Sequence, residues 1–251
     1  MPPGQRVRGA SFKEEYSDSV LFHTYRKKPQ RSSITYLIAP KESKLAGRPT
    51  VVLDLDETLV YARDGPLYVR PGLEELLQFL GENCETVLWT AGVKHYAEAV
   101  VRQIDRNGIV HHTICRDSAW FNGASCSKDL KLLGRDTATT IVFENTPDCI
   151  RGFEQNGVLV ADYEGGELED HTLYAILGLL CDLVQQRSRN AALTVPEFIS
   201  TSHRLEQRDV PTDDGKIMRC YCLKQQQQME PRRRRSETVR TANRRCNVAV
   251  H

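Results

Sequence analysis

The stretch VVLDLDETLV, residues 51–60, puts three carboxylates into a run that otherwise predicts a buried strand. Its valines and leucines favour the interior, where an unpaired carboxylate is costly. Asp and Glu are also poor strand formers. We therefore expect Asp54, Asp56 and Glu57 to sit at the tip of a strand rather than within it.

Outward from this stretch, strand-like and helix-like segments alternate. Short apolar runs predict strands over residues 49–56, 85–91, 110–116, 139–145 and 156–163. Apolar residues at helical spacing predict helices over residues 71–82, 95–104 and 168–186. Strands separated by helices imply parallel pairing and a layered α/β fold. The pattern fades after residue 187, where residues 195–208 are compatible with one more helix.

The composition is that of an ordinary soluble globular protein, with 251 residues, 40% hydrophobic and 27% charged, and a net charge of +1. Residues 1–49 hold ten Lys or Arg against four Asp or Glu, and residues 224–251 hold eight against two. Residues 50–223 are therefore acidic, between two basic ends. An acidic body argues against direct nucleic-acid binding by this part of the chain.

Most of the eight cysteines lie in apolar stretches, which suits small buried side chains in a reducing compartment. The pair Cys220 and Cys222 has no second pair at zinc spacing and does not favour a metal site. Residues 172–184 form the longest apolar stretch, but it is too short to span a bilayer and contains Asp182. We expect a soluble intracellular protein without a membrane span.

Three predicted strands end in polar residues of a matching kind. The first ends at Asp54, the second at Thr90, and the fourth at Glu144 and Asn145. In an open parallel sheet, reactive groups collect at the carboxyl ends of the strands. Such a cluster of oxygen ligands is best held together by a hard cation, and we expect Mg²⁺. The carboxylates of the opening stretch are then tolerated because they surround a metal.

The run D-x-D-E-T-L after an apolar strand resembles motif I of the haloacid dehalogenase superfamily. Four further segments resemble, in order and spacing, the small C-terminal-domain phosphatase family, also called NLI-interacting-factor-like: RPG (70–72), VLWTAGVKHYAEAV (87–100), CRDSAWFNGASCSKDLKLLGRD (115–136) and VFENTPDCI (142–150). The resemblance covers roughly residues 50–186. It implies a three-layer, Rossmann-like haloacid dehalogenase fold with a central parallel sheet and little or no cap.

The resemblance also implies a role for each site residue. Asp54 would be the nucleophile and a Mg²⁺ ligand. Asp56 would be the general acid and then the base, with its backbone carbonyl on the metal, and Thr58 would orient it. The remaining implied roles are binding of the phosphate oxygens by Thr90 and Lys128, contact with the substrate phosphate by Arg116, coordination of Mg²⁺ by Asn145, and support of the metal through water by Glu144.

The implied function is a Mg²⁺-dependent protein serine/threonine phosphatase that works through an aspartyl-phosphate intermediate, with a phosphoprotein as its partner. Two departures qualify it. The family usually carries Asp where this chain has Glu144. The segment between Thr58 and Arg70 is short, whereas members that act on the polymerase tail carry an inserted β-hairpin there. That particular substrate is therefore in question.

The competing hypothesis is a receptor subunit of the mitochondrial presequence translocase, which shares this domain and would bring translocase partners. Residues 104–117 and 155–166 resemble that subfamily about as well. The intact D-x-D-x-T favours catalysis, and a third hypothesis is an inactive scaffold with a basic tail. We favour the phosphatase, in the nucleus or cytoplasm, with the mitochondrion as the alternative.

We expect four segments. They are an N-terminal arm that is partly disordered (1–45), the phosphatase-like catalytic domain (46–190), a C-terminal extension (191–223) and a basic disordered tail (224–251).

Overall fold

The computed structural model describes residues 35–63, 65–123 and 126–224. Most of the expected N-terminal arm, residues 1–45, and nearly all of the expected basic tail, residues 224–251, lie outside the described residues. The expectations for those two segments therefore remain predictions.

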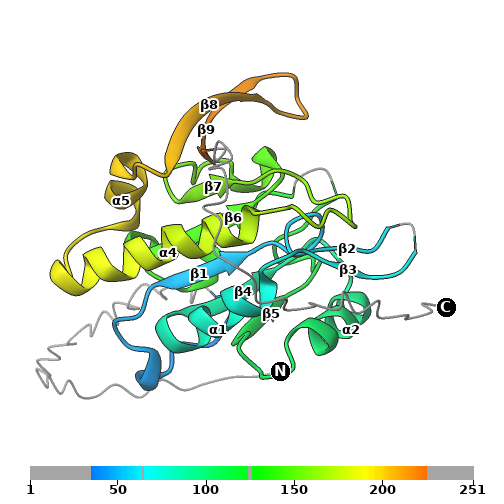
Figure 1. Cartoon of the computed structure of the whole chain (residues 1–251), viewed down its shortest axis with the longest axis horizontal. Helices are drawn as coiled ribbons and strands as arrows, with labels where there is room; N and C mark the ends of the chain where they lie inside the picture. The colour runs from blue at the N-terminus through cyan, green and yellow to red at the C-terminus, as the bar shows by residue number, and fades with distance from the viewer. Residues whose placement is uncertain (1–34, 64, 124–125, 225–251) are drawn as a thin grey trace, which may run out of the picture. The chain divides into compact units, whose positions relative to one another are not determined.

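The described chain forms a central sheet of seven strands in the order β5-β4-β1-β6-β7-β9-β8 (Figure 1). The strands are β1 (Thr50–Leu53), β4 (Glu85–Trp89), β5 (His112–Ile114), β6 (Thr140–Glu144), β7 (Gly157–Leu159), β8 (Leu205–Pro211) and β9 (Ile217–Leu223). All neighbouring pairs are parallel except β8 with β9. The five predicted strands are confirmed, each shorter than expected, and so is the layered α/β class.

The three predicted helices are also confirmed. The helices of the described chain are α1 (Leu73–Asn83), α2 (Lys94–Ile104), α3 (Leu130–Leu133), α4 (Thr172–Arg189) and α5 (Val195–Thr201), and the 3₁₀ helices are η1 (Ser43–Leu45), η2 (Thr137–Thr139) and η3 (Pro147–Ile150). Figure 1 shows α1 and α4 side by side over β1. The buried side chains of α1, α2, α4 and α5 share one core cluster, and those of α3 belong to a second cluster on the other face of the sheet.

The central strands are buried on both faces because their side chains alternate between the two core clusters. Val51 and Leu53 of β1 lie in the cluster with α1 and α4, whereas Val52 between them lies in the other. This is the period-two geometry of a strand. It explains why the last three residues of β1, 51–53, are all apolar, as expected for a parallel strand covered on both sides.

The segment after α4 differs from the prediction of a single helix over residues 195–208. A helix forms only over α5, where Thr194 and Glu197 make a capping box. The chain then adds β8 and β9, and β9 pairs in parallel with β7, so the extension widens the central sheet. β8 was missed because, apart from Leu205, its side chains are partly or fully exposed, as suits an edge strand.

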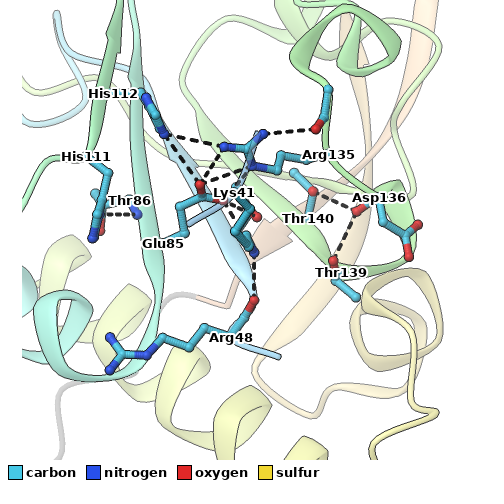
Figure 2. Close-up of polar contacts among 12 residues, drawn as sticks. Lys41, Arg48, Glu85, Thr86, His111, His112, Arg135, Asp136, Thr139 and Thr140 are labelled. Carbon is cyan, nitrogen blue, oxygen red and sulfur yellow. Dashed lines mark hydrogen bonds and ion pairs between the residues drawn. The ribbon is translucent and has the colours of Figure 1, made fainter. Parts of the chain in front are cut away.

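At the edge of the sheet where β1 and β4 begin, a fully buried carboxylate organises a polar cluster (Figure 2). Glu85, at the start of β4, accepts a hydrogen bond of 2.8 Å from Thr50 and one of 2.7 Å from Nη2 of Arg135. Lys41 Nζ lies 3.3 Å and His112 Nε2 lies 3.5 Å from the same carboxylate. The cluster ties residues before β1 to β4 and β5.

We predict that Glu85→Gln lowers the free energy of unfolding by about 3–5 kcal/mol at pH 7, because Arg135 and Lys41 lose their buried counter-charge. Burial raises the pKa of the Glu85 carboxyl, but hydrogen bonds from Arg135 and Thr50 outweigh it and lower the pKa to about 2. Because the pKa is lowered in the folded state, the ionised Glu85 stabilises the fold fully at pH values above the ordinary pKa of 4.5. This stabilisation is lost as the pH falls towards 2.

Urea unfolding of wild type and variant at pH 7 and pH 3 measures this. We expect the difference between the two proteins to shrink at pH 3. The exposed Glu82 gives a matched control, since Glu82→Gln should change stability by less than about 0.5 kcal/mol. Equal stability of wild type and Glu85→Gln at pH 7 would contradict the assignment.

Candidate active site

The register of the parallel strands brings the predicted residues together. Leu53 of β1 pairs with Leu88 of β4 on one side and with Phe143 of β6 on the other. Asp54 follows directly after β1, and its amide donates to the carbonyl of Phe143 at 3.0 Å. Glu144 ends β6 beside it. The three strands therefore present their terminal side chains at one edge of the sheet.

A pocket of about 430 Å³ opens at this edge. Its lining includes seven of the eight predicted site residues: Asp54, Asp56, Thr90, Arg116, Lys128, Glu144 and Asn145. Thr58 is fully buried behind it. The seven residues predicted from the sequence motifs thus line one pocket, although they lie up to about ninety positions apart in the chain.

Lys128 is the centre of the buried charge in the pocket. Its ammonium lies 2.8 Å from Oδ1 of Asp54 and also contacts Oε2 of Glu144. The other oxygen of Glu144 accepts a hydrogen bond of 3.1 Å from the amide of Thr146. Both oxygens of Glu144 are therefore engaged by the protein. The lysine side chain is 2% exposed, so these contacts are shielded from water.

The pKa values of this cluster reflect burial and a shortage of positive charge. Burial lowers the pKa of Lys128, but the carboxylates of Asp54 and Glu144 outweigh it and raise that pKa above its usual value. Burial raises the pKa of Asp54, and Lys128 opposes this only in part. Burial and the charge of Asp54 raise the pKa of Glu144 to about 8. One ammonium does not balance two carboxylates in this interior.

The second carboxylate of the motif is held from the opposite side. Tyr96, in the first turn of α2, donates its hydroxyl to Oδ1 of Asp56 at 2.5 Å. Thr90 donates to Oδ2 of Asp56 at 3.0 Å and accepts from the amide of Gly92 at 2.8 Å. Burial and the contact with Asp56 raise the pKa of Tyr96, so the phenol keeps its proton. The two hydroxyls fix the orientation of Asp56.

Thr58 occupies a different place from the one that its implied role suggested. Its hydroxyl donates to Oδ1 of Asn145 at 3.4 Å, while Asp56 is oriented by Thr90 and Tyr96. The amide nitrogen of Asn145 donates to Oδ1 of Asp162 at 3.0 Å. These contacts fix the orientation of the Asn145 amide.

The loop that carries the motif depends on a buried arginine. Arg70, which is 1% exposed, donates to the carbonyl of Thr58 at 3.0 Å and to both oxygens of Asp170 at 3.0 and 2.8 Å.

Glu57 has a φ of 57°, a left-handed conformation that costs energy for a residue other than glycine. Gly72, two residues after Arg70, has a φ of 89°, and a Cβ there would lie 3.0 Å from the ring of Tyr174.

Arg116 lies at the rim of the pocket. Its guanidinium donates to the carbonyl of Ala91 at 2.6 Å and stacks over the ring of Phe121, 4.7 Å from the ring centroid. Neither of these two contacts is with an acidic side chain. Arg116 therefore places a positive charge beside the pocket. An anion that enters the pocket would meet this charge.

Sequence reasoning missed four residues of the site: Tyr96, Asp162, Cys126 and Cys149. Tyr96 lies in a helical segment where a tyrosine is unremarkable, and Asp162 lies just beyond β7. Cys126 and Cys149 line the pocket wall, and their sulfur atoms lie 2.6 Å apart. The spacing of 23 residues between them gave no recognisable pattern.

The oxygen donors that line the pocket fit a hard divalent cation, provided that donors other than carboxylates take part. When Asp54, Asp56 and Glu144 are ionised, Lys128 leaves two negative charges uncompensated. Within the described ranges, however, no three His, Cys, Asp or Glu side chains converge as a metal-binding group. The donors that would hold a cation are therefore of mixed type: a carboxylate oxygen of Asp54, the amide oxygen of Asn145, the backbone carbonyl of Asp56 and water.

The fold and the site together define an α/β protein with a carboxylate cluster at the carboxyl edge of a parallel sheet. Within that class, the chain belongs to the NLI interacting factor-like phosphatase family, whose model matches residues 49–190, more than half of the chain. This confirms the family that the sequence motifs implied.

Two curated relatives show the extent of the similarity. The "Probable C-terminal domain small phosphatase" of Dictyostelium discoideum is 30% identical over 59% of this chain and 55% of its own. The human "Carboxy-terminal domain RNA polymerase II polypeptide A small phosphatase 1" is 31% identical over 54% of this chain and 59% of its own. The matched part of the chain thus spans just over half the length of these relatives.

Among solved structures, Fcp1, described as an essential RNA polymerase II CTD phosphatase, is similar to this chain with a TM-score of 0.48 and 18% identity. The match covers 60% of this chain and 69% of that one. None of the helices in the described ranges is both long and apolar enough to cross a membrane. The two curated relatives carry phosphatase names, and the comparisons do not support the mitochondrial alternative.

Proposed function

We propose that this protein is a Mg²⁺-dependent protein serine/threonine phosphatase that works through an aspartyl-phosphate intermediate. The observation that carries the proposal is the contact of the buried Lys128 ammonium with Asp54, in a pocket where Asp56 is held by two hydroxyls. A nucleophile, a group for proton transfer and a fixed positive charge are the parts that phosphoryl transfer requires.

In this proposal, Asp54 attacks the phosphorus of a phosphate monoester and the bond to the alkoxide oxygen breaks. Asp56 gives its proton to that oxygen, and the alcohol leaves. Asp56 then takes a proton from water, which attacks the phosphorus and releases phosphate and free Asp54. Tyr96 acts as a positioning residue because its hydroxyl holds one oxygen of the Asp56 carboxyl group during both proton transfers, which leaves the other oxygen for the transferred proton.

The phosphate oxygens would be bound by positive charge and hydroxyl groups from different segments. Lys128 approaches from the buried side, beside Asp54, and Arg116 from the rim. Thr90, which donates to Asp56 in this structure, also lines the pocket, and its hydroxyl would turn to a phosphate oxygen when substrate binds. These groups would oppose the charge on the transferring phosphoryl group.

Mg²⁺ would be held by Asp54, the carbonyl of Asp56 and the amide oxygen of Asn145, and when bound it would neutralise charge on the phosphoryl oxygens. Asn145 is oriented for this by Thr58 and Asp162. Glu144 was expected to support the metal through water. Since both of its oxygens contact Lys128 and Thr146, we propose that its main role is to hold Lys128 in place.

The substrate would be a phosphoserine or phosphothreonine on a protein surface. Between β1 and α1, β2 (Val60–Tyr61) and β3 (Tyr68–Val69) pair as a two-stranded antiparallel sheet. Ala62 and Arg63, directly after β2, line the pocket. Two relatives are named for RNA polymerase II, and a nuclear or cytoplasmic phosphoprotein is the partner that we propose by analogy.

The decisive assay is hydrolysis of an aryl phosphate by the purified full chain, with Mg²⁺ and with a chelator. We expect hydrolysis only with Mg²⁺, and then release of phosphate from phosphoserine peptides. The receptor alternative predicts tight binding of presequence peptides and no hydrolysis. A protein that hydrolyses neither substrate at any Mg²⁺ concentration would refute the proposal.

The metal assignment makes a further prediction for two neighbouring residues. Asn145→Ala should raise the Mg²⁺ concentration for half-maximal activity by at least about tenfold, because it removes a proposed ligand. Glu144→Asp should leave that concentration nearly unchanged and lower kcat instead, because the shorter side chain reaches Lys128 less well. Activity measured against Mg²⁺ concentration separates the two effects. A larger shift in the Mg²⁺ requirement for Glu144→Asp would make Glu144 the metal ligand.

A further inference from the structure

The pocket wall contains a pair of thiols that the proposed reaction does not use. The sulfur atoms of Cys126 and Cys149 lie 2.6 Å apart, closer than an ordinary non-bonded contact and about half an ångström longer than a disulfide bond. Both cysteines are free in this structure, and both line the pocket. Among the described cysteines, no other contact between two sulfur atoms is this close.

The backbone already holds the two segments side by side. The amide of Lys128 donates to the carbonyl of Cys149 at 2.8 Å, and the hydroxyl of Ser127 donates to the carbonyl of Arg151 at 3.4 Å. A bond between the sulfur atoms would therefore need a small movement and would leave Lys128 in place. The segment that it would tether is the one that carries the proposed phosphate-binding ammonium.

The two thiols differ in accessibility, as an attacking and a resolving cysteine should. Cys126 is half-buried and faces the pocket, whereas Cys149 is 6% exposed. The contact from Cys149 and the charge of Lys128 lower the pKa of Cys126 to about 7, although burial opposes this. A large part of Cys126 is then thiolate at neutral pH, which is the form that reacts with peroxide.

We propose that Cys126 and Cys149 form a reversible disulfide in the wall of the pocket, which protects Cys126 from irreversible oxidation by peroxide while Lys128 stays in place. The Cys126 thiolate attacks an oxygen of hydrogen peroxide, the O–O bond breaks, and a sulfenic acid and water result after protonation. The Cys149 thiol then attacks that sulfur and displaces water. Two thiols and one peroxide thus give one disulfide and two waters.

Without the second thiol, the sulfenic acid would react with more peroxide and become a sulfinic acid, which thiols do not reduce. A sulfinate at Cys126 would put a negative charge two residues from Lys128, in a pocket lined by the proposed nucleophile. Phosphate would then be repelled. This consequence for hydrolysis rests on the proposed function, whereas the disulfide itself does not.

The test uses the full-length protein treated with increasing hydrogen peroxide, alkylated, digested without reduction and analysed by mass spectrometry. We expect a crosslink between the peptides of Cys126 and Cys149, lighter by two hydrogens, which disappears with a dithiol. Cys149→Ser should instead gain two oxygens at Cys126 that a dithiol does not remove. Cys181→Ser, at an exposed cysteine on α4, is the matched control and should behave like wild type.

Three results would overturn the proposal: no crosslink at peroxide concentrations that oxidise Cys181, pairing of Cys126 mainly with another cysteine, or a Cys149→Ser protein that resists over-oxidation. Hydrolysis is measured in parallel. Treatment with peroxide and then with a dithiol should leave the wild-type protein active. The same treatment should lower kcat of Cys149→Ser by at least about tenfold relative to the untreated variant. If the crosslink forms in a protein without hydrolytic activity, the disulfide stands and the proposed function fails.

Discussion

Replacing Asp54 by Asn should reduce kcat for aryl phosphate hydrolysis by at least about a thousandfold, which is about 4 kcal/mol in the barrier. The amide keeps the shape of the side chain but is not a nucleophile, so no aspartyl-phosphate can form. Oδ1 of the asparagine can still accept the hydrogen bond from Lys128 that now measures 2.8 Å. The loss should therefore be a loss of chemistry.

Stability separates this result from simple unfolding. In the variant, Lys128 still faces Glu144, so one ammonium is matched with one buried carboxylate. We expect the free energy of unfolding to stay within about 1 kcal/mol of wild type, because a carboxylate with a raised pKa has been removed.

The same chemical change at Asp213, an exposed residue in the turn between β8 and β9, provides the control. Asp213→Asn should alter neither activity nor stability. A folded Asp54→Asn protein with activity near that of wild type would end the mechanism proposed above. A second carboxylate of the cluster would then have to be the nucleophile.

The edge of the sheet that carries the site could be predicted because its chemistry follows directly from its strands. Asp54 comes after the apolar β1, Thr90 after β4, and Glu144 ends β6. Since parallel strands keep their carboxyl ends at one edge, recognising three strands was enough to place three functional side chains. The three side chains meet in one pocket because β4, β1 and β6 are also neighbours in the sheet.

Contacts that arise between a strand end and a distant loop or helix could not be predicted in this way. Tyr96 contacts Asp56 from α2, forty residues further along the chain, and no local pattern encodes that contact. Likewise, the sequence suggested that Lys128 binds phosphate but not that Glu144 holds it. β9 alternates buried and exposed side chains, a signal that could have revealed it, but β8 has too few buried positions to show one.

Lys128→Met should have the largest combined effect on activity and stability. It leaves Asp54 and Glu144 in the interior without their shared counter-charge, which should cost about 3–5 kcal/mol of unfolding free energy at pH 8. Loss of the ammonium should also reduce kcat by at least about a hundredfold, because no other cation contacts the nucleophile in the described pocket.

The pH dependence identifies the cause. Burial already raises the pKa values of Asp54 and Glu144, and removal of Lys128 should raise both further. A carboxyl whose folded pKa is raised binds its proton more tightly in the folded state, so the stability of the variant should fall as the pH rises from 5 to 8. The gap from wild type should therefore be small at pH 5 and large at pH 8, measured by urea unfolding.

The double variant Lys128→Met with Glu144→Gln tests the assignment of the charge. Glutamine removes one of the two stranded carboxylates, so the double variant should recover most of the lost stability at pH 8. Its activity should stay low, because the ammonium beside Asp54 is still absent. If the double variant is no more stable than Lys128→Met, the cost comes from lost packing of the lysine stem. Recovery of activity together with stability would instead mean that Lys128 serves only to hold the fold together.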